Sequence, residues 1–90
     1  MDIFAQMAQR IIKEQESIIG PVALEQAKKV PGLKIDWQNH EVALGGDEKA
    51  IIENLVKQYQ NLFGQTSVEV CKDAIKGLSV PADSLPALLK

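Results

Sequence analysis

Apolar residues recur at helical spacing over most of this chain, and glycine and proline divide the pattern into five segments. The first segment runs from about residue 2 to residue 19, with Asp2 as the expected N-cap. A polar run over residues 13–17 interrupts its apolar stripe. This pattern predicts a helix whose buried face is wetter at its centre than at its ends. The stripe consists of Phe4, Met7, Ala8, Ile11, Ile12, Ile18 and Ile19.

Two further helices are predicted on either side of a central segment. Gly20-Pro21 separates the first helix from the second, because proline suits the first turn of a helix and disfavours helical geometry in the residue before it. The second helix is expected to stop at Pro31-Gly32. The third helix follows Asp47 as N-cap and ends at Gly64. Its wide apolar stripe predicts that it forms the centre of the core.

The last third of the chain predicts one more helix and a short terminal element. Thr66 and Glu69 have the spacing of a capping box, so the fourth helix is expected to start there and to stop at Gly77. The tail is expected to add a short helix capped by Ser84, with its leucines packing on the core. We find no internal repeat, and we predict a single mostly α domain over residues 1–90, a bundle of four to five helices.

Residues 33–44 change from helical spacing to the period of two that strands show. A two-residue turn at Asn39-His40 would pair Trp37 with Val42 and Ile35 with Leu44, with all four side chains on one face. Histidine is a poorer second turn residue than glycine. Two interpretations are therefore open: a short β-hairpin lying on the helices, or an irregular loop.

Charge and composition exclude several classes of function. Ten Lys and Arg stand against twelve Asp and Glu, a net charge of −2, whereas a nucleic-acid binder is expected to carry a strongly basic patch. The nearest basic cluster, Lys28, Lys29 and Lys34, makes nucleic-acid binding the weakest of three hypotheses. We find no signal peptide and no run near the ~20 apolar residues that cross a bilayer. With one cysteine and no disulfide, we expect a cytoplasmic protein that does not enter membranes.

The residues that could carry catalysis are too dispersed to predict an enzyme. Cys71 falls on the apolar stripe of the fourth helix and is expected to be inert packing. Gly45-Gly46-Asp47 lacks the spacing of a phosphate-binding loop and indicates ordinary helix capping. His40 is the single histidine, and no zinc-type ligand spacing surrounds it. We therefore expect no enzymatic activity and no cofactor.

The run Ile18-Ile19-Gly20-Pro21-Val22-Ala23 resembles a short helical C-terminal segment of bacterial signalling proteins. In those proteins a helix ending in I-G-P-[IV]-A continues into a second helix and follows kinase, cyclase or roadblock-type regions. The likeness covers about residues 9–30. It implies a small helical accessory to signalling and assigns no functional residue.

These observations favour a non-enzymatic protein–protein interaction or regulatory module. The first helix carries more large apolar groups than a core this small is expected to hide, and an exposed remainder would mark an interface. The partner would be another protein or a second copy of the chain. The alternative is that these residues close the bundle. The candidate interface residues are Ile3, Phe4, Met7 and Ile11, with Trp37 as a further anchor if it is exposed.

A second hypothesis is a small-ligand or metal binder. It would use a cleft near Asp36, His40 and Glu41, with Asp47 close by. The hypothesis depends on one histidine among several acidic residues.

Overall fold

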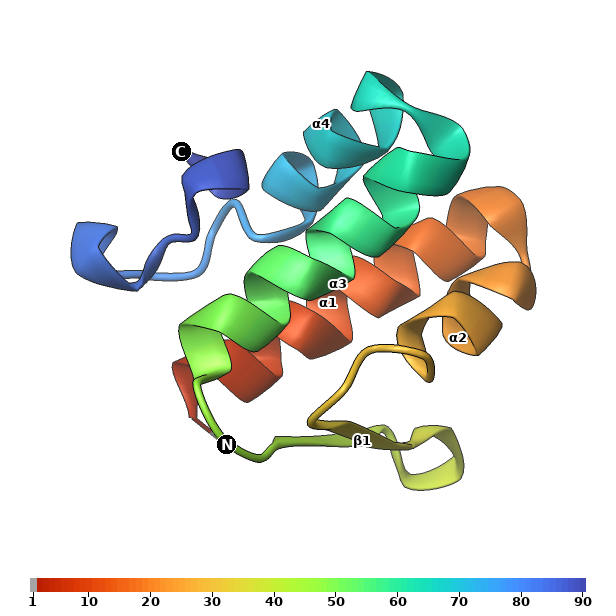
Figure 1. Ribbon diagram of the computed structural model, residues 1–90, viewed down its shortest axis with the longest axis horizontal. Coiled ribbons are helices and arrows are strands. Elements are labelled where there is room, and N and C mark those ends of the chain that lie inside the picture. The colour runs from red at the N-terminus through yellow and green to blue at the C-terminus, as the bar shows by residue number, and fades with distance from the viewer. Residues whose placement is uncertain (1) are drawn as a thin grey trace.

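The computed structural model describes residues 2–90, in which four α-helices surround a core and one short antiparallel hairpin lies beside them (Figure 1). The predicted mostly α fold is therefore confirmed, and of the two interpretations of residues 33–44 the hairpin is the one observed. The tail forms two 3-10 turns, Ala82–Ser84 and Ala87–Leu89, instead of a fifth helix. The elements are α1 (Ile3–Ile19), α2 (Val22–Ala27), β1 (Leu33–Asp36), β2 (Glu41–Leu44), α3 (Glu48–Phe63) and α4 (Gln65–Ala74).

The four helices form two similar units, each a long helix followed by a short one. The long helices α1 and α3 run side by side in the same direction, and α2 and α4 fold back along them (Figure 1). Each long helix begins at an aspartate whose Oδ1 accepts a backbone N–H: from Ala5 to Asp2 at 2.8 Å, and from Ala50 to Asp47 at 3.2 Å. These two caps confirm the predicted starts of both helices.

Each long helix also ends at a glycine with nearly the same backbone angles. Gly20 has φ 75° and ψ −155°, and Gly64 has φ 80° and ψ −166°. Side chains other than hydrogen are strongly disfavoured in this region, so glycine alone reverses the chain here without strain. Gly64 serves directly as N-cap of α4, and no side chain caps that helix. The predicted capping box at Thr66 is therefore wrong, because α4 begins at Gln65, ahead of the threonine.

Aligning the two units on Gly20 and Gly64 shows a structural repeat, although the sequence itself contains no evident one. Most buried positions coincide along both units, although few side chains are identical. The repeat lies in burial and backbone geometry, which explains why the letters of the sequence did not reveal it. The matched buried pairs are Met7 and Ile51, Ala8 and Ile52, Ile11 and Leu55, Ile12 and Val56, Gln15 and Tyr59, Ala23 and Ser67, Ala27 and Cys71, and Val30 and Ala74.

Reciprocal hydrogen bonds join the two units across the core. The Tyr59 hydroxyl of α3 donates to the carbonyl oxygen of Ala23 in α2 at 2.7 Å. The matching residue of α1, Gln15, donates from Nε2 to the carbonyl oxygen of Ser67 in α4 at 3.1 Å. Each long helix thus holds the short helix of the other unit through the same position.

A second matched pair of positions holds the segment that follows each unit. Gln9 Nε2 on α1 donates to the carbonyl oxygen of His40 in the hairpin turn at 2.9 Å. Its counterpart on α3, Glu53, accepts the backbone N–H groups of Ala87 and Leu88 at 3.0 and 3.2 Å. The hairpin therefore packs on α1 and the tail packs on α3 and α4 (Figure 1).

The hairpin is present, but its predicted register is wrong by two residues. Leu33 pairs with Leu44, and Ile35 pairs with Val42. The turn takes four residues instead of two, because a 3-10 turn over Trp37–Asn39 is closed by His40 at φ 52°. A shift of two preserves the side-chain alternation, so the same apolar face still points to the core.

We predict that alanine at either glycine turn destabilises the fold. Gly20→Ala and Gly64→Ala should each lower the free energy of unfolding by about 1–3 kcal/mol, because both glycines have positive φ. An added Cβ would meet no atom within 4 Å at either position, so the loss would come from backbone strain and not from a steric clash. Urea denaturation followed by circular dichroism measures the loss. Gly45→Ala is the control: it has no positive φ, and its stability should stay within about 1 kcal/mol of the parent. Equal losses at Gly45 and Gly64 would contradict the strain argument.

Candidate functional site

The interface predicted on the first half of α1 is wrong for two of its residues. Met7 and Ile11 are fully buried in the core, where no partner can reach them. Ile3 and Phe4 are partly buried and pack against the same core. The physical reason is that α1 contacts α2, α3, α4 and β2, so several of its faces are covered. The alternative, that these residues close the bundle, describes this part of the helix.

Trp37 is partly buried against the core beside α1. Its indole Nε1 donates to a carboxylate oxygen of Glu16 at 3.3 Å. Its ring also lies near the imidazole of His40, with the ring centroids 5.4 Å apart. Trp37 therefore holds the hairpin turn against α1. It is not the exposed interface anchor that the sequence allowed.

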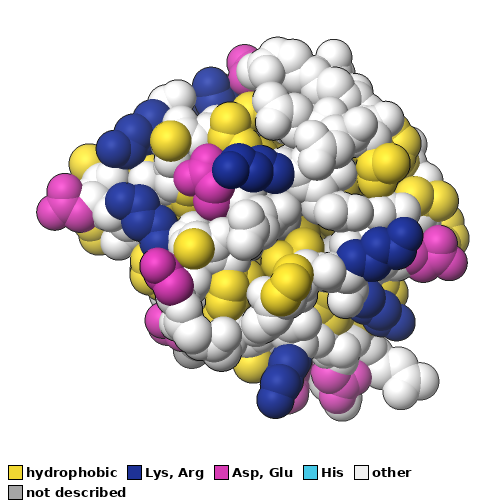
Figure 2. Space-filling view, viewed as in Figure 1, with side chains coloured by type: hydrophobic (Ala, Val, Ile, Leu, Met, Phe, Trp, Pro, Cys, Tyr) yellow, Lys and Arg dark blue, Asp and Glu magenta, His cyan; other side chains and the backbone are white. Residues whose placement is uncertain are grey.

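The large apolar side chains that the structure leaves exposed lie elsewhere, on the two glycine turns. They are Ile18, 59% exposed, Leu62, 51%, Phe63, 41%, and Val22, 39%. We call these four residues the apolar tip. Both turns lie at the same end of the bundle (Figure 1), and hydrophobic side chains gather at the right-hand edge of Figure 2, over the turn from α1 to α2.

The apolar tip continues the apolar stripes of α1 and α3 past the region where neighbouring elements bury them. Ile18 lies two helical turns after the buried Ile11, on the same side of α1. Leu62 has the same relation to the buried Leu55 on α3. Both helices therefore extend an apolar face past the point where the bundle covers it. The exposure is repeated at matched positions of the two units, so it is a property of the repeat.

Sequence reasoning placed the tip residues on the core stripes, because their helical spacing is that of the core. A periodic pattern shows which side of a helix is apolar, but not how far along the helix a neighbour covers it. The available signal was that Ile18-Ile19 and Leu62-Phe63 are two apolar pairs, each directly followed by a glycine.

Buried polar groups hold the two turns in place beneath the tip. The Tyr59 hydroxyl reaches Ala23, next to Val22, and the Gln15 amide reaches Ser67 and, at 3.5 Å, Cys71 Sγ. Burial raises the pKa of Tyr59 far above its usual value, and the nearby Cys71 and Glu16 add to the shift. Burial also raises the pKa of the Cys71 thiol to about 11, although the Gln15 hydrogen bond opposes the shift. Both groups are therefore neutral at physiological pH and serve as packing and hydrogen-bonding groups.

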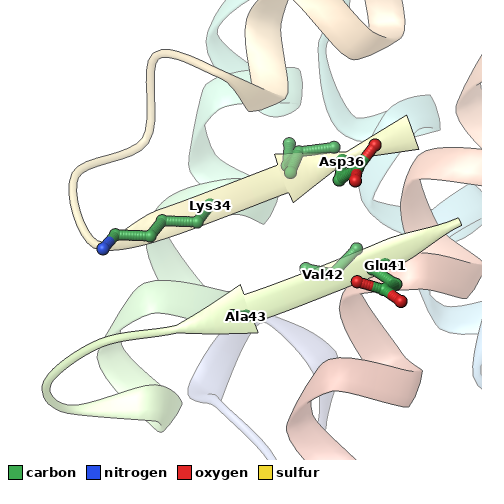
Figure 3. A pocket seen from close by; sticks show the side chains of 6 residues that line it. Lys34, Asp36, Glu41, Val42 and Ala43 are labelled. Carbon is green, nitrogen blue, oxygen red and sulfur yellow. The ribbon is translucent and has the colours of Figure 1, made fainter. Parts of the chain in front are cut away.

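The hairpin carries the site that the small-ligand or metal hypothesis would use. A shallow depression of about 400 Å³ is lined by Ile35 and Val42 and by three charged side chains, Lys34, Asp36 and Glu41 (Figure 3). Asp36 and Glu41 are directly paired across the strands, and like charges in that position repel each other. Lys34 lies at the other end of the depression (Figure 3).

The other two residues predicted to bind a ligand, His40 and Asp47, do not line this depression. His40 is exposed in the turn, and Asp47 caps α3 and does not line the depression. Within residues 2–90 no group of three His, Cys, Asp or Glu side chains is placed to hold a metal ion. The small-ligand or metal hypothesis stays a prediction.

The basic residues of the nucleic-acid hypothesis are exposed but few. Lys28 and Lys29 follow α2, and Lys34 lies on β1, close in sequence to Asp36. Three lysines fall short of the strongly basic surface that nucleic-acid binding requires. None of the helices in the described part of the chain has the length and apolar character needed to span a bilayer.

We predict that the Tyr59 hydroxyl stabilises the fold through its bond to Ala23. Tyr59→Phe should lower the free energy of unfolding by about 1 kcal/mol, the usual net value of a buried hydrogen bond. Denaturation in urea, with the slope of the transition unchanged, measures the effect. Stability equal to that of the parent would show that the Ala23 carbonyl needs no partner beyond its own helix.

We predict that Cys71 reacts slowly while the protein is folded. Its folded pKa of about 11, against 9.0 for a free thiol, makes the reactive thiolate roughly a hundredfold rarer at pH 8. Because the pKa is raised on folding, the stability associated with the protonated thiol is complete below pH 9 and is lost as the pH rises towards 11. Labelling with DTNB, with and without urea, tests this. Equal rates in both conditions would contradict the burial of Cys71.

Comparison with known proteins adds no assignment to this geometry. No family model, no curated protein and no solved structure matches the chain. The likeness of Ile18-Ile19-Gly20-Pro21-Val22-Ala23 to a segment of bacterial signalling proteins stays a prediction, and in the structure this run forms the turn from α1 to α2.

Proposed function

We propose that this chain is a non-enzymatic protein–protein interaction module whose binding surface is the apolar tip. The observation that carries the proposal is the exposure of Ile18 and Leu62. They occupy matched positions on the apolar stripes of α1 and α3, beyond the region that neighbouring elements bury. An exposed apolar patch of this kind can be buried by the apolar surface of a partner. The module acts as a cytoplasmic accessory to signalling if the likeness of residues 18–23 holds.

The size of the apolar tip favours a transient interaction. Fully burying a side chain of this kind stabilises by about 1.5–3 kcal/mol, and the four side chains are on average roughly half exposed. Covering them would therefore contribute roughly 3–6 kcal/mol, while association costs at least about 4 kcal/mol in lost freedom. The tip alone gives little net affinity, so its partner must add contacts around the rim.

The buried or exposed state of the reactive residues supports a non-enzymatic role. Cys71 is buried and protonated, and His40 is exposed on a turn where its imidazole lies beside Trp37. Asp36 and Glu41 are both exposed to solvent, whereas a carboxyl that serves as a general acid is typically enclosed by apolar side chains. The residues best able to do chemistry are therefore either hidden or surrounded by water.

Site-specific photo-crosslinking in the native cell tests the proposal. A photoreactive amino acid at Leu62 should give a discrete adduct, whereas the same amino acid at the exposed Asp83, on the tail, should give none. The mass of the adduct distinguishes a partner protein from a second copy. Adding Ile18→Glu to the Leu62 probe should remove the adduct without unfolding the chain, because Ile18 is mostly exposed. No adduct at Leu62, or equal adducts at both positions, would overturn the proposal.

A further inference from the structure

The hairpin leaves one of its two edges open. Strand β2 packs along α1, and Gln9 on that helix donates to the carbonyl oxygen of His40 just before the strand. Strand β1 lies on the other side of the hairpin and packs chiefly on β2. A strand with a free edge presents backbone N–H and C=O groups that can pair with another strand. The edge of β1 is therefore a surface to which a further strand can add.

The pairing of the hairpin shows which backbone groups of β1 face that edge. The Gly45 N–H donates to the carbonyl oxygen of Gly32, directly before β1, at 2.8 Å. Bonding directions alternate along an antiparallel ladder, so Lys34 and Asp36 bond to β2 while Ile35 points its N–H and carbonyl the other way. Within residues 2–90 no backbone bond outside the helices and the ladder reaches Ile35. These two groups are therefore available to an added strand.

The exposed face of β1 carries two opposite charges, one on each side of Ile35. Lys34 and Asp36 are both exposed, and both line the shallow depression of Figure 3. Asp36 lies opposite Glu41 in the hairpin, and its Oδ2 accepts the Asn39 Nδ2 at 2.7 Å. In the described part of the chain neither Lys34 nor Asp36 forms a salt bridge. Each charge is thus free to meet an opposite charge on another strand.

We infer that two copies of this chain pair antiparallel through β1, with Ile35 at the two-fold symmetry axis. In this register the N–H of each Ile35 donates to the carbonyl of the other, because both groups face the open edge. Lys34 of each copy then lies opposite Asp36 of the other, in the kind of pair that brings side chains closest. The two hairpins would form one four-stranded sheet. This surface differs from the apolar tip, and the inference does not depend on the proposed function.

The order of the charges makes β1 complementary to itself in this register. A shift of two residues would place Lys34 against Lys34 or Asp36 against Asp36, and in-register parallel pairing would also bring like charges together. The surrounding charges add no strong repulsion between copies, since residues 28–44 carry Lys28, Lys29 and Lys34 against Asp36 and Glu41. A second copy therefore meets this edge with both charges matched, whereas a strand of another protein would need the same alternation.

The contact is small, so the expected dimer is weak. A stable interface buries about 800 Å² on each partner, which is more than one strand of four residues offers. Ile35 is partly buried, so part of its side chain remains for the other copy to cover. A dissociation constant on the order of 0.1–1 mM is expected. The dimer therefore forms at high concentration, or where a partner holds two copies together.

Sedimentation velocity and NMR spectra of the purified chain test the inference without any substitution. Between about 20 µM and 1 mM, the sedimentation coefficient should rise from that of a monomer towards that of a dimer. The amide signal of Ile35 should shift in step with the dimer fraction, because its N–H gains a hydrogen bond. The amide of Lys57, on the exposed face of α3, should stay in place.

Charge reversal with a matched rescue tests the register. Lys34→Glu should weaken the dimer at least about tenfold, because two favourable cross-strand pairs become repulsive. Asp36→Lys should do the same, and the two changes together should restore the affinity to within about threefold, since the charges match again with exchanged signs. Lys57→Glu makes the same change in net charge as Lys34→Glu and should leave the affinity within about twofold. Circular dichroism checks that each variant is folded.

The other outcomes separate this inference from the proposed function. A monomer at every concentration would overturn it, as would a dimer that leaves the Ile35 amide unmoved or survives Lys34→Glu. A folded double reversal that does not restore the dimer would overturn the antiparallel register. A dimer lost in Leu62→Ser but kept in Lys34→Glu would place the contact at the apolar tip, against this inference and in favour of the proposed function.

Discussion

The arrangement of this molecule depends on the reciprocal bonds from each long helix to the short helix of the other unit. Tyr59 and Gln15 occupy the same place in the repeat, and each donates to a backbone carbonyl across the core. A buried donor that loses its acceptor costs about 1–3 kcal/mol, so the two bonds restrict how the units can slide past each other. The glycine turns are thereby fixed at one end of the bundle. Together with the packing of the shared core, these bonds keep the two halves of the apolar tip at the same end of the bundle.

The sequence predicted the helices and their ends better than it predicted the strand register and the exposure of individual side chains. Asp2 and Asp47 marked the starts of the long helices, and Gly20 and Gly64 marked their ends, because capping and positive φ are local requirements. The alternation of residues 33–44 left a hairpin and an irregular loop open. The register of the hairpin depends on the length of its turn, and that turn is held against α1 by the bonds from Trp37 to Glu16 and from Gln9 to the His40 carbonyl. Which stripe residues are exposed depended on where neighbouring helices stop, and no local pattern records that.

The two units differ most in the segments that follow them. Gln9 and Glu53 share a position in the repeat, yet the first uses an amide to donate to a carbonyl and the second uses a carboxylate to accept two N–H groups. Each side chain matches the backbone it meets, a hairpin turn in one unit and a 3-10 turn in the other. The same helical position thus holds two different structures, and the units remain alike where they pack on each other.

At the apolar tip, the two units are alike at exposed positions that contribute little to the core. Ile18 and Leu62 are more than half exposed, so a polar side chain at either position would cost the fold little of its buried apolar area. Folding therefore places a weak demand on apolar residues there, and an exposed apolar group raises the risk of unwanted association. The proposed interaction therefore accounts for the exposed apolar groups of the tip better than the stability of the fold does.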